Sequence, residues 1–283
     1  MVLLDRIDKG ILLFALGALA LATVRGGAPA NAAPAQAPPV FLPPPGLPVV
    51  NPTATPVAAK PPGEQGPCPN GMLIVEGEHC PDVEQTCLKY IDPPPYENLR
   101  CAEYAKPAKC KTSTKHRRFC IDRDEWAEQS PTTDPKDALP VVRKSWLEAK
   151  ALCEARGARL CKEGEWELAC EGPEMSPYPY GWKRDSTICN FDRTDLGGAN
   201  EKLTDHRASL KEFPNCVSPY GVHDIVGNVD EWVERESSSA PHRSVLRGGW
   251  WLPGRNRCRA ATVHHGEEYS AKQVGFRCCA DLK

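Results

Sequence analysis

The sequence PYGVHDIVGNVDEW, residues 219–232, carries the most information about the fold. Asp224 and Glu231 flank a stretch that contains too much glycine to favour a regular helix. Their oxygens could converge on one hard cation together with the backbone carbonyls of Gly227 and Val229, because calcium prefers six to eight oxygen ligands of these kinds. The alternative is an ordinary Gly-Asn turn with solvated acids. The local sequence leaves both interpretations open.

Composition describes an ordinary globular protein. Hydrophobic residues make up 41% of the 283 residues and charged residues 25%. The formal net charge is -2, which argues against a nucleic-acid or anionic-membrane partner.

The first quarter of the chain does not have the pattern of packed protein. Residues 1–33 contain an apolar, uncharged run (10–24) followed by small residues, as in a secretory signal peptide. The run is shorter than the roughly 20 residues that span a bilayer, although an uncleaved N-terminal anchor remains the alternative. Residues 34–67 are dominated by Pro and Ala, which predicts a disordered, extended spacer. The predicted folded domain is therefore 68–283, exported to the periplasm or the exterior, or held on the outer face of a membrane.

Fourteen cysteines support export. All of them lie between Cys68 and Cys279, and none is in a Cys-x-x-Cys pair. An even number without that spacing predicts structural disulfides, which persist in oxidising compartments. Because a bond between adjacent residues is strained, Cys278 and Cys279 should each bond a distant partner, such as Cys258.

Regular structure is expected to be sparse. The Cys-rich part, 68–120, has many turn signals, with short strands predicted at 72–75 and 118–121. A helix should begin after Ser145, because Glu148 three residues on completes a capping box, and should end at Gly157. A second helix is predicted over 164–170. The glycines, prolines and asparagines beyond it predict long ordered loops.

Five blocks, in this order, resemble the sulfatase-modifying-factor family, whose best-known member is the formylglycine-generating enzyme. They are FCIDRDE (119–125), PVV to SW with Ala149 (140–149), RLCKEGEWE (159–167), residues 220–232, and RGGW (247–250) followed by GFR (275–277). The blocks extend over most of the domain. Each is weak alone, but the ordered set is specific.

The resemblance implies a disulfide-rich α/β (α+β) domain of low regular secondary structure, related to C-type-lectin-like folds. It also implies calcium, held by the positions that correspond to Asp224, Gly227, Val229 and Glu231. A second family calcium site has its candidates at Asn190, Phe191 and Asp205, although the spacing differs here.

The resemblance does not extend to the family's catalytic copper site. The formylglycine-generating enzyme oxidises a cysteine of a sulfatase with oxygen and a copper ion held by two cysteines, a soft donor pair that suits Cu(I). Here Pro253 occupies the first cysteine position and Trp250 replaces the family's serine. Cys258 is the remaining candidate, and its surroundings resemble a buried strand in which a disulfide is expected. Copper is therefore not expected.

Two functions from different classes follow. The first is an exported, calcium-stabilised module that recognises a protein or a glycan, for which Trp250 and Trp251 beside Arg255 and Arg257 offer a binding platform if they are not simply buried. The second is an oxidoreductase of the same family with another substrate or metal. No membrane contact is expected apart from an uncleaved N-terminal anchor.

Overall fold

A computed structural model of the chain describes residues 66–96, 100–127, 137–195, 204–237 and 241–283. The predicted signal or anchor segment (1–33) and all of the predicted spacer except its last two residues lie outside the described residues. None of the helices in the described part is long and apolar enough to cross a membrane.

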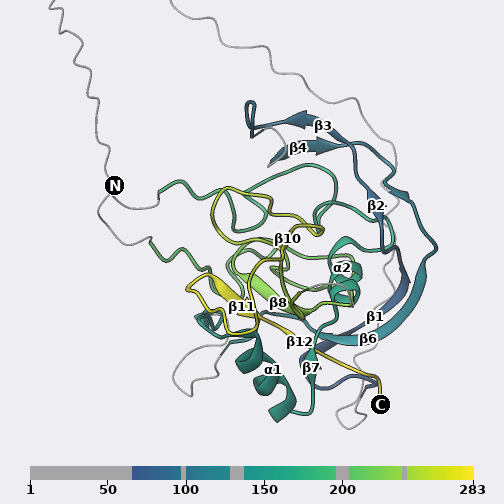
Figure 1. Ribbon diagram of the computed structural model, residues 1–283, viewed down its shortest axis with the longest axis vertical. Helices are drawn as coiled ribbons and strands as arrows, with labels where there is room; N and C mark the ends of the chain where they lie inside the picture. Colours follow the sequence, from purple (N-terminus) through teal and green to yellow (C-terminus); the bar gives the residue numbers. More distant parts are fainter. Residues whose placement is uncertain (1–65, 97–99, 128–136, 196–203, 238–240) are drawn as a thin grey trace, which may run out of the picture. The chain divides into compact units, whose positions relative to one another are not determined.

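The described chain is an α+β arrangement of short strands, two helices and long ordered loops (Figure 1). The elements are β1 (Met72–His79), β2 (Val83–Glu84), β3 (Cys87–Tyr90), β4 (Cys101–Tyr104), β5 (Lys109–Cys110), β6 (Lys115–Asp122), α1 (Trp146–Ala155), β7 (Arg159–Leu160), α2 (Glu163–Glu171), β8 (Asp230–Glu234), β9 (Ser244–Arg247), β10 (Ala261–Thr262), β11 (Val274–Phe276) and β12 (Cys278–Ala280).

One four-stranded sheet has the order β1-β6-β12-β7. In its antiparallel β1–β6 pair, the half nearest β12 is mainly apolar, and there residues 119–122 of β6 are buried, with Val75 of β1 opposite Phe119. The predicted strands covered this half. Both strands continue into a half that is more exposed, where Glu76 pairs with Arg118, and opposite charges across a strand pair stabilise it without apolar alternation.

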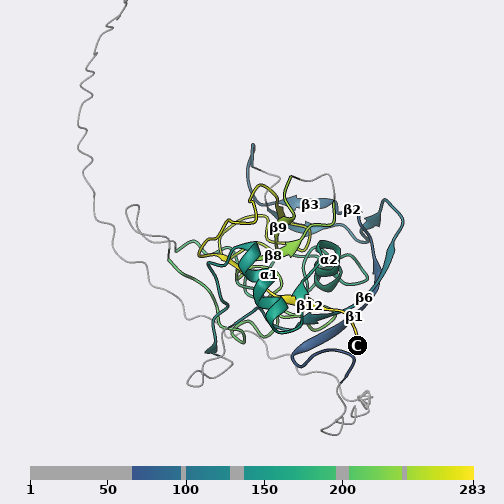
Figure 2. The same ribbon diagram turned by 60° about the horizontal axis from the view of Figure 1, so that its bottom comes forward.

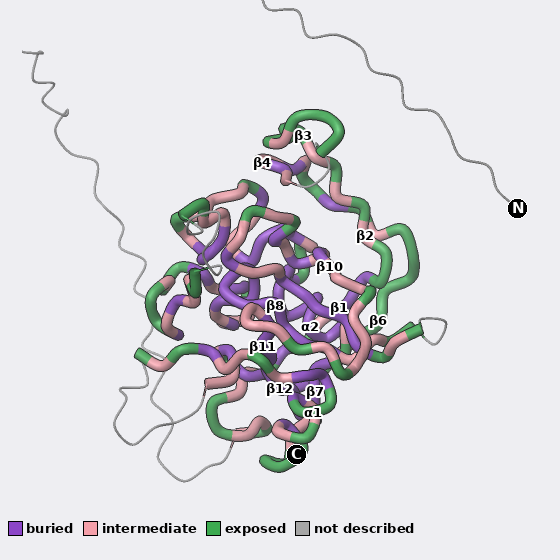
Figure 3. Tube along the Cα trace, turned by 60° about the vertical axis from the view of Figure 1, so that its left-hand side comes forward, coloured by how far each residue is buried: buried purple, intermediate pink, exposed green. Residues whose placement is uncertain are grey.

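The second four-stranded sheet has the order β10-β9-β8-β11, with β8 antiparallel to β9 and parallel to β11. The sequence predicted long ordered loops with few regular elements beyond α2, which agrees with the short strands found there, but it did not locate β8, β9 or β11. Burial is greatest around β8 and α2 (Figure 3). Two apolar clusters fill this interior, one around Trp166 and the other around Trp146 and Trp232.

Both predicted helices are confirmed. Ser145 caps α1: its hydroxyl accepts from the backbone N–H of Glu148 at 3.2 Å, and the Glu148 carboxylate accepts from the Ser145 N–H at 2.8 Å. The chain leaves this helix through Gly157, at φ 75°. Helix α2 is one residue longer at each end than predicted (Figure 2).

Helix α2 is buried despite its acidic residues, because arginine side chains form ion pairs with them. Glu167 and Glu171 lie one turn apart on the same face. The Glu167 carboxylate contacts Arg247 and Arg259 at 2.8 Å each, and Nε of Arg259 donates to Glu171 at 2.6 Å. His79 of β1 lies 2.8 Å from Glu167. Buried charges are tolerated when they are paired in this way.

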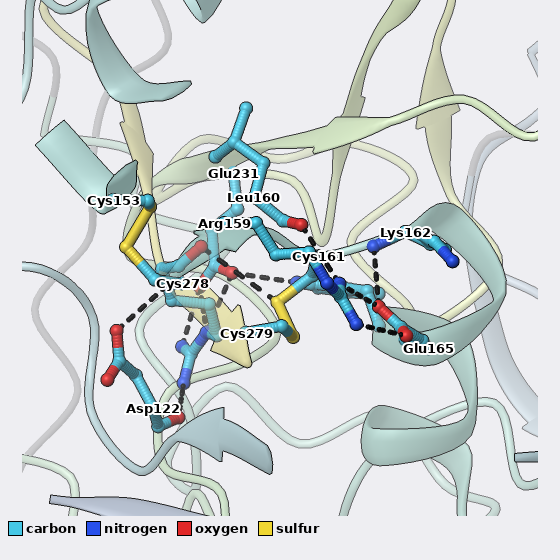
Figure 4. Close-up of a disulfide and its surroundings, with 12 residues drawn as sticks. Asp122, Cys153, Arg159, Leu160, Cys161, Lys162, Glu165, Glu231, Cys278 and Cys279 are labelled. Carbon is cyan, nitrogen blue, oxygen red and sulfur yellow. Dashed lines mark hydrogen bonds and ion pairs between the residues drawn. A yellow bond between two sulfur atoms is a disulfide. The ribbon is translucent and has the colours of Figure 1, made fainter. Parts of the chain in front are cut away.

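Seven disulfides bond all fourteen cysteines, which confirms the structural role predicted for them. The pairs are Cys68–Cys120, Cys80–Cys110, Cys87–Cys101, Cys153–Cys278, Cys161–Cys279, Cys170–Cys258 and Cys189–Cys216. Successive residues of a strand point to opposite faces. Cys278 and Cys279 of β12 therefore reach different partners, one on α1 and the other just after β7 (Figure 4). Both partners are distant, as expected, but Cys258 is neither of them.

The two ends of the described domain meet. The backbone N–H of Lys283 donates to the carbonyl of Pro67 at 3.2 Å. The next residue, Cys68, is bonded to Cys120 of β6, the strand that pairs with β12. The first and last described segments are thus held beside the central strands β6 and β12 of the first sheet.

Candidate functional site

The turn before β8 has an unusual backbone. Asp224 and Asn228 have φ of 53° and 54°, and Gly227 has φ of 84°. A side chain at Gly227 would also place its Cβ 2.5 Å from the carbonyl oxygen of Asn190, so this position requires glycine. The residues with positive φ bend the backbone back on itself, so that Asp224 and Glu231 belong to one compact turn.

Asn228 holds the turn against the rest of the domain. Its fully buried carboxamide donates to Glu125 at 2.6 Å, and its oxygen accepts from the Ala208 N–H at 2.8 Å and from Asn190 at 3.0 Å. The Asn228 backbone N–H donates to the carbonyl of Asn190 at 2.8 Å. Asn190, predicted for a second metal site, therefore packs directly on the turn.

Glu231 faces an arginine. Both carboxylate oxygens accept from Arg277, at 2.7 Å and 3.0 Å from Nε and 2.6 Å from Nη2, and one also accepts from the indole N–H of Trp166 at 2.7 Å. Arg277 and Glu231 are both fully buried. The guanidinium also donates to the carbonyl of His223 at 2.9 Å. This ion pair joins the turn to the residue between β11 and β12.

Acids outnumber bases around the turn. Glu125, Asp224 and Glu231 are buried there and influence one another, with Arg277 as the opposing charge. Burial raises the pKa of Asp224 to about 8, and burial together with the neighbouring carboxylates raises the pKa of Glu125 well above its usual value. One Glu125 oxygen, Oε1, is buried without a hydrogen-bond partner.

Such an excess of buried negative charge suits a cation. Some of the residues here suit calcium. Asp224 of the turn and the unpartnered Oε1 of Glu125 beside it are hard oxygen donors, whereas both carboxylate oxygens of Glu231 already accept hydrogen bonds from Arg277. Among the described residues, no group of three or more His, Cys, Asp or Glu side chains is arranged to hold a metal. Any ion in the turn would therefore depend on backbone carbonyls such as those of Gly227 and Val229.

The three candidates for the second site have other contacts. Both oxygens of Asp205 accept from Arg207, at 3.1 Å or less, on a half-exposed side chain. Phe191 is buried, with Arg184 4.6 Å above its ring. Asn190 donates to the carbonyl of His206 at 2.7 Å. The structure brings Asn190 beside the chain that follows Asp205, and the second calcium site stays a prediction.

The segment in which the sequence resemblance predicts the family's copper loop, 247–258, contains no free thiol. Cys258 is fully buried and bonded to Cys170 of α2. The expected buried strand around Cys258 was wrong, because β10 begins only at Ala261 and Cys258 is fixed by its disulfide and by its N–H bond to the Pro177 carbonyl at 2.8 Å. Trp251 is fully buried, whereas Trp250 is partly exposed.

Sequence reasoning assigned no chemistry to Glu125, Asn228 or Arg277. Glu125 and Arg277 both stand in the quoted motif blocks, and Arg277 is a lone charge between apolar neighbours in GFRCCA. A charge in such a run predicts a buried ion pair, but the identity of its partner, 46 residues earlier, depends on the tertiary fold.

Comparison with known proteins assigns the family. The family model of the sulfatase-modifying factor enzyme 1-like domain matches residues 91–282. The inactive C-alpha-formylglycine-generating enzyme 2 of Bos taurus is 31% identical over 173 residues, which is 56% of this chain and 57% of that protein. The formylglycine-generating enzyme of Thermomonospora curvata is 31% identical over 173 residues, which is 50% of this chain and 55% of that protein.

Among solved structures, PvdO from Pseudomonas aeruginosa aligns with a TM-score of 0.45 and 17% identity, covering 79% of this chain and all of that one. The chain spans little more than half the length of the two curated relatives. The family match covers about two thirds of the chain, and the disulfide-rich α+β fold agrees with it. The chain belongs to the family with a sulfatase-modifying factor enzyme 1-like domain, the formylglycine-generating-enzyme type.

Proposed function

We propose that this chain is an exported recognition module of the family, stabilised by calcium, that binds a protein or a glycan and does not carry out copper-dependent cysteine oxidation. One observation carries the proposal: the one cysteine in the region of the family's copper loop, Cys258, is closed in a buried disulfide, and Pro253 stands at the other copper position. A Cu(I) site of the family type requires two thiolates.

The comparisons do not distinguish a recognition module from an oxidoreductase. One similar protein is named as inactive and another as a formylglycine-generating enzyme, at the same identity. Fold alone does not determine which of these activities a member has. The alternative, an oxidoreductase with another metal or substrate, would require chemistry from residues other than a thiol, or reduction of the Cys170–Cys258 bond.

The oxidase alternative has a direct test. Purified, oxygenated protein is loaded with copper or iron and incubated with cysteine-containing peptides, and aldehyde product is sought by mass spectrometry. We expect none, while the Thermomonospora curvata relative serves as the positive control. Aldehyde formation that disappears in Cys258→Ser would overturn the proposal.

Export rests on the disulfides. Seven bonds in the described domain are typical of proteins that mature in oxidising compartments. The periplasm, the cell exterior or the outer face of a membrane are the proposed locations.

Calcium is the proposed stabilising ion of the turn at Asp224. A ligand that binds only the native state adds about 2.7 kcal/mol at a concentration of 100 Kd. For a domain of this size we therefore expect a chelator to lower the melting temperature by roughly 5–10 °C. The measurement is a calorimetric scan with and without calcium.

The control for the calcium prediction is Asp224→Asn, which removes the charge of the proposed ligand but keeps its shape. The melting temperature of this variant should be the same with and without calcium. The half-exposed Asp82, which is paired with Lys111, provides the comparison, and Asp82→Asn should keep the calcium response. A wild-type melting temperature that changes with neither calcium nor chelator would refute the proposed calcium site.

A further inference from the structure

A pocket of about 270 Å³ lies beside the loop that aligns with the family's copper site. It is lined by Asp230 at the start of β8, by Leu246 of β9, and by Gly249, Trp250, Pro253 and Asn256 of the loop between β9 and β10. By the sequence resemblance, Pro253 and Trp250 stand where the family has a cysteine and a serine. None of the residues that line the pocket carries a thiol.

Asp230 is the acid of this pocket. It is 8% exposed, and its carboxylate accepts the backbone N–H of Gly249. Glu167, Glu171 and Glu231 are comparably buried, and each contacts an arginine within 3 Å. In the part of the chain that the structure describes, no Lys, Arg or His lies within 4.0 Å of Asp230.

A buried carboxylate without a directly paired cation is unfavourable unless a bound ligand supplies the opposite charge. The lining around Asp230 is mostly apolar, with Leu246, Pro253 and Ala260 beside the partly exposed indole of Trp250. An aromatic ring next to a carboxylate is the combination that attracts a positively charged group, because the ring face is negative. Arg255 also lines the pocket and attracts the Asp230 carboxylate, but it is exposed to solvent and makes no ion pair within 4.0 Å with a described residue, so the place of a direct counter-ion is not filled.

Apart from Asp230 and Arg255, the polar side chains of the lining are Asn256 and the single hydroxyl of Thr262. The Asn256 amide donates to the carbonyl of Trp250, and its oxygen lies 3.4 Å from a donor of Arg184. Gly249, at φ 77°, packs so closely on Asn256 that a Cβ would lie 2.7 Å from its amide nitrogen. Asn256 is thus fixed inside the loop and not free for a ligand. A sugar needs several convergent hydrogen-bonding groups, whereas a single cation needs one.

We propose that this pocket binds a primary ammonium group on a short alkyl stem, with Asp230 as its counter-ion and Trp250 as its aromatic wall. A lysine side chain and a free alkylamine share this chemistry. The inference rests on the proposed recognition function and narrows it, because lysine would make the partner a polypeptide.

The experiment measures binding by NMR titration of the full-length, oxidised protein, following the indole N–H signals. The probes are butylammonium, the N-acetyl amide of lysine, the same compound acetylated on its side chain, and methyl glucoside. We expect the first two to shift the signal of Trp250 and the acetylated compound to bind at least about tenfold more weakly, the loss expected when a charge-assisted hydrogen bond is removed. Butylammonium binding as tightly as the lysine compound indicates a free amine as the source, and tighter lysine binding indicates a polypeptide.

Two variants test the residues. Asp230→Asn should weaken butylammonium binding at least about tenfold, and Trp250→Leu roughly two- to fivefold. The matched control is Asp82→Asn, a half-exposed acid whose partner is Lys111, which should leave binding unchanged. The melting curve of Asp230→Asn shows whether the fold is kept, and Trp250→Leu gives an independent test if it is not.

The outcomes separate the two proposals. Equal binding of butylammonium by wild type and folded Asp230→Asn, no binding of either amine, or preferential binding of methyl glucoside would overturn the ammonium site and leave a recognition module intact. Aldehyde formation in the oxidase assay would overturn the module whatever the pocket binds.

Discussion

Replacing Arg277 by methionine is expected to lower the free energy of unfolding by about 3–5 kcal/mol, the usual loss when one partner of a buried ion pair is removed. The methionine fills a similar volume but leaves the Glu231 carboxylate buried without its guanidinium. The turn that contains Asp224 loses its connection to β12 at the same time. Urea unfolding, followed by tryptophan fluorescence in calcium-saturated buffer, measures the change.

A double variant separates lost charge from lost packing. Arg277→Met combined with Glu231→Gln should recover part of the loss, because no unpaired charge remains buried. The exposed pair of Arg118 and Glu76 is the control, and Arg118→Met should change stability by less than about 1 kcal/mol. If the double variant is no more stable than the single one, the buried charge is not the cause.

Removing the Cys153–Cys278 bond, by serine at both positions, is expected to cost only about 3 kcal/mol, although the two cysteines are 125 residues apart. The neighbouring Cys161–Cys279 bond already joins the same two segments in the unfolded chain, so the loop that Cys153–Cys278 adds is about ten residues. The Cys87–Cys101 bond closes a separation of 14 residues, so the equivalent double variant should also lose about 3 kcal/mol. Urea unfolding of the two variants without reductant, each compared with wild type, measures both losses.

A loss from the Cys153–Cys278 variant that exceeds the other by more than about 1 kcal/mol would contradict this expectation. It would show that native packing around the sulfur atoms, not the conformational freedom of the unfolded chain, determines what each bond contributes. Helix α1 offers a check, since its circular dichroism should persist in the Cys87–Cys101 variant and weaken first in the variant without Cys153.

Local signals predicted the parts of the fold that depend on neighbours in sequence. The capping box of Ser145 and Glu148 and the glycine at 157 specify α1 without reference to the rest of the chain. Strand β8 gives no such signal, because Asp230–Val233 is buried on both faces and lacks polar alternation. Its parallel partner β11 lies about 40 residues later, a pairing that only the tertiary fold determines.

The candidate site likewise combines a backbone shape that the local sequence predicted with side-chain contacts that only the tertiary fold determines. Glycine and asparagine in the turn at 224–231 predicted its bent backbone, and the left-handed residues there agree. The partners of its acids come from elsewhere, Arg277 from the end of the chain and Glu125 from the residues after β6. Disulfide pairing was likewise open, because seven bonds among fourteen cysteines are selected by proximity in three dimensions.

The hydrogen bond between Lys283 and Pro67 places the first and last described segments of the domain side by side. A domain whose ends touch can be inserted as a cassette into a surface loop of a host protein, or circularly permuted, without stretching its sheets. The Cys68–Cys120 bond would then keep the junction covalently attached to β6, even where the surrounding linker moves freely.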